Sequence, residues 1–202
     1  MHWDRFFEDL EDQLTSEWEA ERAALDTEAE RLRLARVSLR ERLRAMVSRE
    51  GAGAPPAFEL VDGTVARGQV SGVGADWVGL APSGPAGVVL IPLHAIVAIG
   101  MPHADLLRSA RPEAITGPSL FADRLTLGFV LRDVSRRRLP VSLSVTGGRM
   151  LSGTIDRAGA DHLDIALHDP GAARRADAVT GHRMVPFPAL VHVRVDAPLA
   201  LP

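Results

Sequence analysis

Two stretches of this 202-residue chain repeat each other, and the repeat restricts the fold more than any other feature of the sequence. Residues 63–76 align without a gap with residues 148–161, and after a loop that differs in length, residues 91–97 align with 185–191. Five aligned pairs in the first stretch are identical: Gly63/Gly148, Gly68/Gly153, Gly74/Gly159, Ala75/Ala160 and Asp76/Asp161. Glycines at the same aligned positions indicate that the chain bends at the same positions in both copies. The sequence therefore predicts one small folding unit that occurs twice.

Each copy has the pattern of short β-strands. In the second copy, apolar residues alternate with other residues over 141–145 and again over 163–167, which is typical of strands with one buried face. Residues 146–148 and 159–161 are expected to be turns. About five short strands in ~45 residues, with glycines at the bends, predict a small closed or nearly closed β-barrel. We place the two barrels at residues 58–100 and 141–196.

The segment 101–140 between the copies is predicted to contain a connector and a helix. Ser119 is a suitable N-cap, the helix should extend to Arg138, and Pro140 lies just past its end. Four apolar residues are expected to form its buried stripe: Leu120, Leu127, Leu131 and Val134. Residues 197–202 are then left as a short tail.

The first fifty residues contain neither glycine nor proline, which favours a long helix followed by a linker at 51–57. Five apolar residues recur every seven positions: Trp18, Leu25, Leu32, Leu39 and Met46. The intervening seam positions of a coiled coil should also be apolar, but here Glu21, Glu28 and Arg42 occupy them. The coiled-coil pattern is therefore weak. We therefore expect residues 1–50 to form an amphipathic helix or a helical hairpin.

Charge is segregated along this arm. Residues 1–30 carry eleven acidic residues and two arginines, a net charge of −9, whereas residues 31–50 carry a net charge of +5. Such a helix would be matched to an antiparallel copy of itself or to its own other half, and a solvated charged face is the simpler alternative. The sequence predicts a homodimer or a protein partner that binds Trp18, Leu25, Leu32 and Leu39. Trp77 aligns with His162 on a polar strand face, and we expect it to pack against the other barrel, the N-terminal helix or another chain.

Composition excludes several classes of function. With no cysteine, the chain has no disulfide, thiolate metal site or cysteine nucleophile. The N-terminus lacks a basic region leading into an apolar run, so we expect a cytoplasmic protein. Residues 77–104 contain no charged side chain other than histidine, but prolines divide them into pieces shorter than the ~20 residues of a membrane-spanning helix. We expect no membrane association.

Several of these patterns resemble a known family. The helix, strand, Gly-Gly turn and strand with a central glycine, followed by residues 159–167, resemble an Sm-like barrel. The run Leu93-His94-Ala95-Ile96 is similar to a late strand of the bacterial Sm-like RNA chaperone. The resemblance implies Sm-like or SH3-like barrels in tandem. The whole chain also resembles an uncharacterised family of high-GC bacteria that is sometimes labelled Fis-type transcriptional regulator, although no helix-turn-helix pattern supports that label.

The chain departs from the Sm-like pattern at the residues that would bind RNA. Asp164 stands where those proteins carry asparagine, and residues 185–188 stand where they carry a basic or Arg-Gly pair. An acid in place of an amide repels phosphate and removes a donor. The resemblance therefore bears on the fold more than on RNA binding.

No catalytic, cofactor or metal-binding residue is predicted. His162, Asp164 and His168 share a strand face, but the ~7 Å between alternate residues lets one ion reach only the first two, so a solvated polar face is favoured. No serine lies in a Gly-x-Ser-x-Gly elbow, and no lysine is present for a phosphate-binding loop.

A nucleic-acid contact is the alternative to protein binding. It would use four arginines near the end of the predicted second helix: Arg132, Arg136, Arg137 and Arg138. The net charge of −3 argues against it, since strong nucleic-acid binders are usually basic. The sequence thus predicts an α+β protein with a long N-terminal helix, two duplicated barrels and an intervening helix, serving as a non-catalytic interaction or scaffold protein.

Overall fold

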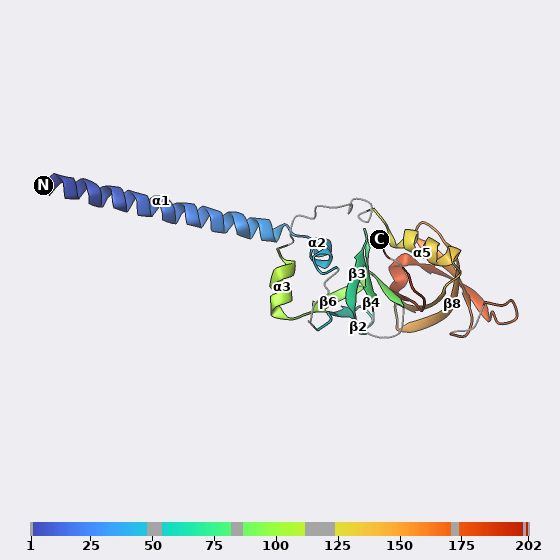
Figure 1. Cartoon of the computed structure of the whole chain (residues 1–202). Helices are drawn as coiled ribbons and strands as arrows, with labels where there is room; N and C mark the ends of the chain where they lie inside the picture. Colours follow the sequence, from blue (N-terminus) through green and yellow to red (C-terminus); the bar gives the residue numbers. More distant parts are fainter. Residues whose placement is uncertain are drawn as a thin grey trace. The chain divides into compact units, whose positions relative to one another are not determined.

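The computed structural model describes residues 2–47, 54–81, 87–111, 124–170, 174–199 and 201, with the side chains of the first helix described from Trp18 onward except at position 20. The chain divides into two units, Met1–Ser38 and Leu39–Pro202. Its described part is a mixed α+β structure with two sheets of antiparallel strand pairs (Figure 1).

The predicted arm consists of two helices rather than one. Helix α1 spans His2–Ala35, and after Ser38 the short helix α2 spans Leu39–Arg44. The seven-residue pattern therefore ends at Leu32 in α1, because the next member, Leu39, begins a separate helix. Leu43 of α2 is fully buried in the first copy, where Met46 and Val47 pack beside it.

The second copy places a helix before five strands. The first four strands form consecutive antiparallel pairs, and the last strand returns to pair with the first. The order in the sheet is β10-β9-β8-β7-β11. Its elements are α5 (Leu127–Arg136), β7 (Pro140–Val145), β8 (Arg149–Ala158), β9 (His162–Leu167), β10 (Gly181–Pro186), the 3-10 helix η2 (Phe187–Ala189) and β11 (Leu190–Val195).

The first copy follows the same path, with one strand divided. Its elements are β1 (Ala57–Leu60), β2 (Val65–Arg67), β3 (Gln69–Val73), β4 (Trp77–Ala81), β5 (Val88–Pro92), the 3-10 helix η1 (Leu93–Ala95), β6 (Ile96–Gly100) and the following helix α3 (His103–Ser109). Strands β2 and β3 correspond to β8 and are separated at Gly68. A bulge falls at Ser71 in the first copy and at the aligned Asp156 in the second.

One sheet continues through both copies. Eight strands lie in the order β10-β9-β8-β7-β11-β5-β4-β3, and the other three form a sheet β2-β1-β6. The last strand of the second copy, β11, pairs with β7 on one side and with β5 of the first copy on the other. The pairings of the described residues leave both sheets open, so the predicted closed barrels are not confirmed.

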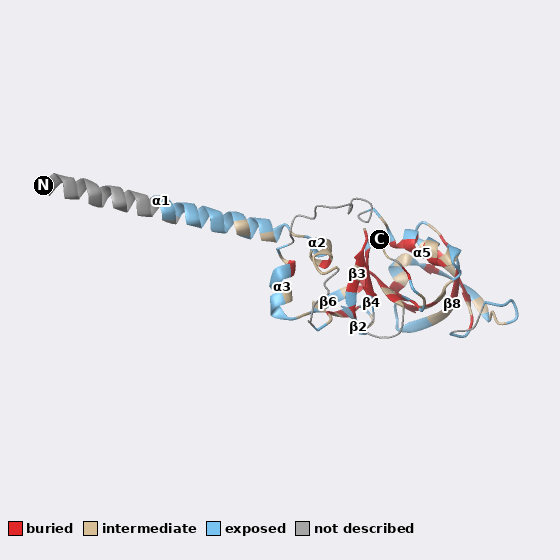
Figure 2. Ribbon diagram, viewed as in Figure 1, coloured by how far each residue is buried: buried red, intermediate tan, exposed pale blue. Residues whose placement is uncertain are grey.

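Two apolar cores lie beneath these sheets, and each includes at least one residue of the other copy; Figure 2 marks the buried residues in red. Val191 of the second copy is buried in the core of the first, against residues that include Leu80 and Ile91. Trp77 of the first copy is fully buried in the core of the second. Of the three packing partners predicted for Trp77, the structure shows the other copy, because the Trp77 ring lies in the core of that copy.

The start of α5 is fixed by the first copy. The Leu127 amide donates to Asp76 Oδ1 at 2.7 Å, and Trp77 Nε1 donates to the Leu125 carbonyl at 2.9 Å. Thr126 is the N-cap residue, so the predicted helix start at Ser119 is wrong; Ser119 and Leu120 themselves lie outside the described residues. The other three predicted stripe residues are buried: Leu127, Leu131 and Val134. No helix in the described part of the chain is long and apolar enough to cross a membrane.

Candidate functional site

The apolar stripe of α1 is the largest predicted interaction surface that the structure leaves exposed. Trp18, Leu25 and Leu32 share one helix face, and each has more than half of its surface accessible. Leu39, the fourth predicted contact residue, is not part of this stripe, because it belongs to α2 and lines a groove beside β6. Three of the four predicted residues therefore form one continuous surface.

The charge of α1 differs from that of the predicted arm. All seven arginines of residues 31–50 were expected to attract the acidic half, but Arg36, Arg40, Arg42 and Arg44 lie beyond the end of α1. Residues 2–35 carry eleven acidic residues and four arginines, a net charge of −7. Arg31 and Arg33 are also paired within the helix, with Glu28 and Glu30. Within α1 alone, an antiparallel pair of helices would therefore set acidic residues against acidic residues along much of its length.

The four predicted nucleic-acid residues lie in the C-terminal half of α5 and just beyond its end, and an acidic side chain pairs with two of them. Arg136 and Arg137 both contact Asp133, each at 2.8 Å. Arg132 Nε donates to the Gly128 carbonyl one turn earlier, at 3.0 Å. Arg138 adopts a positive φ of 53° where the chain leaves the helix. Cations here complement the negative end of the helix dipole, so this arrangement has a structural explanation.

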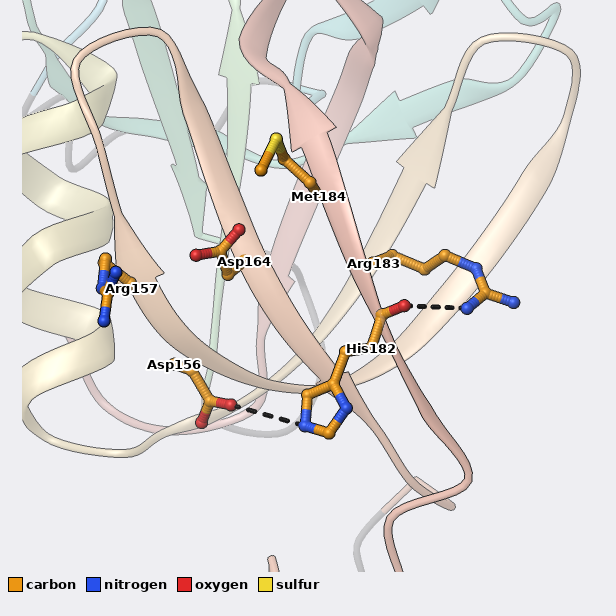
Figure 3. Close-up of a pocket in the computed structure, with 6 residues that line it drawn as sticks. All are labelled: Asp156, Arg157, Asp164, His182, Arg183 and Met184. Atoms are coloured by element: carbon orange, nitrogen blue, oxygen red, sulfur yellow. Dashed lines mark hydrogen bonds and ion pairs between the residues drawn. The ribbon is translucent and has the colours of Figure 1, made fainter.

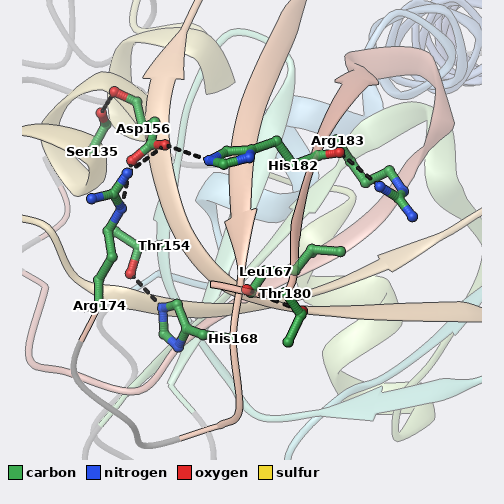
Figure 4. A network of polar contacts seen from close by, with 9 residues as sticks. All are labelled: Ser135, Thr154, Asp156, Leu167, His168, Arg174, Thr180, His182 and Arg183. Carbon is green, nitrogen blue, oxygen red and sulfur yellow. Dashed lines mark hydrogen bonds and ion pairs between the residues drawn. The ribbon is translucent and has the colours of Figure 1, made fainter. Parts of the chain in front are cut away.

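A shallow polar hollow lies where β8, β9 and β10 run side by side (Figure 3). Its lining residues are Asp156, Arg157, Asp164, His182, Arg183 and Met184. Asp156 is held by Arg174, with Nε–Oδ1 and Nη2–Oδ2 both at 2.9 Å, and His182 Nε2 lies 3.9 Å from Oδ2 (Figure 4). A carboxylate held in a two-point arginine pair is a poor general base.

The predicted polar face of β9 is only partly a solvent face. His168 is 5% exposed; its Nε2 contacts Thr154 Oγ1 at 2.8 Å and its Nδ1 contacts the Asp169 carbonyl at 3.1 Å. The interpretation of His168 as solvated is therefore wrong, because both ring nitrogens have partners inside the fold. His162 instead contacts Asp161 at 2.8 Å. No group of three acidic or histidine side chains within the described ranges could hold a metal ion.

A buried polar contact joins the two copies. Ser144 Oγ of β7 donates to Asp62 Oδ2, in the β1–β2 turn, at 2.7 Å. Burial alone would raise the pKa of Asp62, but hydrogen bonds from Thr64 and Ser144 outweigh it and hold that pKa below 3.8. His192 on β11 lies near this carboxylate. Burial lowers the pKa of His192 below 6.5, and its Nδ1 is buried without a hydrogen bond among the described residues.

Sequence reasoning missed that β6 and β10 are two of the four end strands of the sheets. Each exposes an apolar side chain, Val97 at 64% and Met184 at 69%. An apolar groove of about 200 Å³ runs along β6, between it and helices α2 and α3. The residue types alone could not reveal these edges, because a valine or methionine in a strand usually indicates a buried position. The alignment of the two copies carries a signal for these edges, but that signal can be interpreted only when the strand order is known.

Comparison with known proteins adds no assignment to this geometry: no family model, curated protein or solved structure matches the chain.

Proposed function

We propose that this chain is a non-catalytic protein–protein interaction or scaffold protein, in which α1 is the arm that binds a protein partner. The observation that carries the proposal is the exposed stripe of Trp18, Leu25 and Leu32. Apolar side chains spaced by seven pack one helix against another, and exposed apolar surface of this kind marks interaction sites. At ~1.5 Å per residue, this stripe extends over about 20 Å of the helix.

The charge of α1 defines the partner. With a net charge of −7 over residues 2–35, the helix favours a partner whose apolar groove is bordered by basic side chains. A second α1 helix fits less well, because it would bring acidic residues against acidic residues. Exposed ion pairs contribute little individually, so the apolar stripe would supply most of the affinity and the charges the selectivity.

The body of the protein, residues 39–202, is proposed to be a pair of tandem Sm-like β-barrels. Two features support this. Each copy places a helix before its strands, in the order on which the sequence resemblance rests. In each copy the last strand also pairs with the first, β6 with β1 and β11 with β7, which is the connection that a barrel needs.

Nucleic-acid binding, the alternative function, has less support. Asp133 occupies the centre of the arginine group and contacts two of its members. The acid Asp164 also faces the polar hollow, where a phosphate would meet it. Both features weaken the positive field that such binding requires.

A photoreactive amino acid at position 25 of the full-length chain, in its native cell, tests the proposed arm. We expect a crosslinked adduct with a specific protein, identified by mass spectrometry. Leu32→Glu should abolish this adduct, because it places a charge in the apolar contact while remaining a good helix former. Thr27→Glu, on the opposite face of the helix, is the matched control and should leave the adduct unchanged.

Two results would contradict the proposal. One is the absence of any protein adduct at position 25. The other is an adduct that survives Leu32→Glu as well as it survives Thr27→Glu. An adduct consisting of two crosslinked copies of this chain would keep the interaction role but replace the basic partner with self-association of α1.

A further inference from the structure

The body of the protein carries an apolar groove that the structure leaves accessible. Helix α2, strand β6 and helix α3 form its walls (Figure 1). Its volume is about 200 Å³, below the roughly 300–1,000 Å³ of a small-molecule pocket. Each wall contributes an exposed apolar side chain: Leu39, Val97 and Leu106. The groove therefore suits the apolar side chains of a protein segment better than a small ligand.

The elements around the groove are basic. Residues 39–47 and 96–111 carry five arginines and two acidic residues, a net charge of +3. Arg42 lines the groove, and its guanidinium donates to the Ser109 hydroxyl and to the Leu106 carbonyl. Both of these acceptors are uncharged. The positive charge of Arg42 therefore remains available to an acidic partner.

The stripe of α1 has the complementary pattern. Glu21 and Glu28 lie four residues before and three residues after Leu25, so they share its helix face. Glu28 also contacts Arg31 at 3.7 Å, in an exposed pair that contributes little. The stripe thus presents apolar side chains with carboxylates beside them, on a helix whose net charge is −7. This pattern matches an apolar groove that contains an arginine and is surrounded by net positive charge.

We infer that α1 of one chain binds in the groove of a second copy of this chain. Leu25 enters between α2, β6 and α3, and Glu21 and Glu28 lie beside Arg42. An amphipathic helix that lays its apolar face into a hydrophobic groove is a common mode of recognition. The inference rests on the proposed function, because it names the partner of the arm. Each chain supplies one arm and one groove, so exchange in both directions closes a dimer.

The size of the groove limits the strength of the contact. A groove of about 200 Å³ takes few side chains, so the interface belongs with the weak and transient ones that bury less than ~1,200 Å². We expect monomers at about 1 μM and dimers at hundreds of micromolar. Urea denaturation at about 1 μM therefore measures single chains, with or without the arm.

Cysteine pairing tests the contact directly, because the chain contains no cysteine. Full-length Ala29→Cys and full-length Ala98→Cys are mixed at hundreds of micromolar and joined with a short bismaleimide. Ala29 lies one turn after Leu25 and Ala98 lines the groove, so we expect a mixed dimer as the main product. Thr27→Cys, on the opposite face of α1, replaces Ala29→Cys in the matched control and should give little dimer. Equal yields from the two mixtures would overturn the proposal.

The same reagent separates binding between chains from binding within a chain. The double variant Ala29→Cys/Ala98→Cys is treated at about 1 μM, where the proposal expects single chains and no internal link. Peptide mapping by mass spectrometry identifies the linked residues. If this variant is linked within one chain while the mixed single variants give no dimer, the arm binds its own groove and the proposal is wrong.

Sedimentation of the full-length chain tests the apolar part of the contact. Val97→Asp should weaken self-association by at least about tenfold, the loss expected when an apolar contact at the centre of an interface is replaced by a charge. Val65→Asp is the matched control, because it changes an exposed valine of β2 that does not line the groove, and it should have no effect. Either a chain that stays monomeric at hundreds of micromolar or a dimer that Val97→Asp leaves intact contradicts the inference.

Charge reversal tests how the stripe faces the groove. Glu21→Arg combined with Glu28→Arg should weaken the dimer by at least about threefold at low ionic strength, because arginines would then lie beside Arg42. Glu19→Arg combined with Asp26→Arg makes the same change in net charge about a third of a turn away from Leu25, and should have a smaller effect. Equal effects would show that the stripe does not face the groove, and the inference would fail.

The crosslink at position 25 separates this inference from the proposed function. An adduct of two copies fits either the groove or a second α1, so the attached peptide decides between them. Attachment to residues 39–47 or 96–111 supports the groove, and attachment to residues 2–35 overturns it. If position 25 is joined only to a different protein, the arm stands and the groove contact is wrong. If neither position 25 nor the cysteine pair gives a product, both fail.

Discussion

At the scale of single residues, His192 is the side chain with the least favourable surroundings. It is half-buried at the contact between the copies, with one ring nitrogen buried and unpaired among the described residues. Burial disfavours its charged form, and only Asp62 partly compensates. A proton on this ring therefore costs the folded protein more than the unfolded chain.

The sign of the pH dependence follows from the direction of the shift. The folded pKa of His192 is lowered, so the unfolded chain takes up this proton first as the pH falls. The free energy of unfolding should be level above pH 6.5 and should decrease below it, until the folded pKa is passed. The lowered pKa of Asp62 adds a further loss of stability, but only below pH 3.8.

His192→Gln should flatten the decrease in stability that begins at pH 6.5, because glutamine does not titrate. Urea denaturation at a series of pH values measures the effect. His94→Gln is the control, because it also removes an imidazole, but from a histidine that is exposed rather than buried. A variant whose stability falls with pH as steeply as that of the parent chain would contradict this account.

At the scale of elements, α5 is held from two sides. Asp76 and Trp77 of the first copy fix its N-terminal end, and its apolar face packs on β8 and the second core. The helix has one buried face and one exposed face, with Leu131 fully buried and Phe129 mostly exposed. A helix of ten residues is too short to be stable alone, so these contacts supply its stability.

Two substitutions on α5 separate the faces. Leu131→Ala should lower the free energy of unfolding by about 2–5 kcal/mol, because it leaves a cavity in the core. Phe129→Ala should cost less than about 1 kcal/mol, because most of its ring is already in water. Chemical denaturation of the two variants gives both numbers. Similar losses for the two would mean that the exposed face of α5 is covered by another chain.

The sequence predicted the elements of this fold better than their ends. Alternation over 141–145 and 163–167 identified β7 and β9, since the two-residue period of a strand does not depend on what packs against it. The start of α5 was missed because the side chain that accepts from its first amide is Asp76, which lies in a distant turn, rather than a nearby serine. Periodicity could also not separate α1 from α2, because Leu39 keeps the seven-residue spacing across the break.

The sites were less predictable than the elements. Trp18, Leu25 and Leu32 could be found because a helix repeats its exposed face regularly. Trp77 could be predicted to have a packing partner, but strand alternation does not say which of the three expected surfaces covers its face. The β6 and β10 edges depend on which strands remain unpaired, and strand order over distances this long is not encoded locally.

At the scale of the whole molecule, the division of the chain falls between Ser38 and Leu39, twelve residues before the predicted linker begins. Helix α2 therefore belongs with the sheets. Its contribution is Leu43, which lies with Phe58 and Val70 in the core of the first copy. Arg42 adds hydrogen bonds to Ser109 Oγ and to the Leu106 carbonyl of α3. Removing α2 would open this core.

Two shortened chains test whether the folded unit begins at Leu39 or after the predicted linker. A chain beginning at Leu39 should unfold at the same urea concentration as the full-length chain, because it keeps every described contact of Leu43. A chain beginning at Ala57 should unfold at a lower concentration, with a loss of at least about 2 kcal/mol from the exposed core. Equal midpoints for the two shortened chains would place the boundary at the linker instead.

The pairing of β11 with β5 also sets when this protein can finish folding. These strands lie about a hundred residues apart, and loop closure over such distances is slow. During synthesis the first copy leaves the ribosome with β5 unpaired on one side and with Trp77 lacking the second core. Its strands must wait, open to other nascent chains, until residues 190–195 have been synthesised and have left the ribosome.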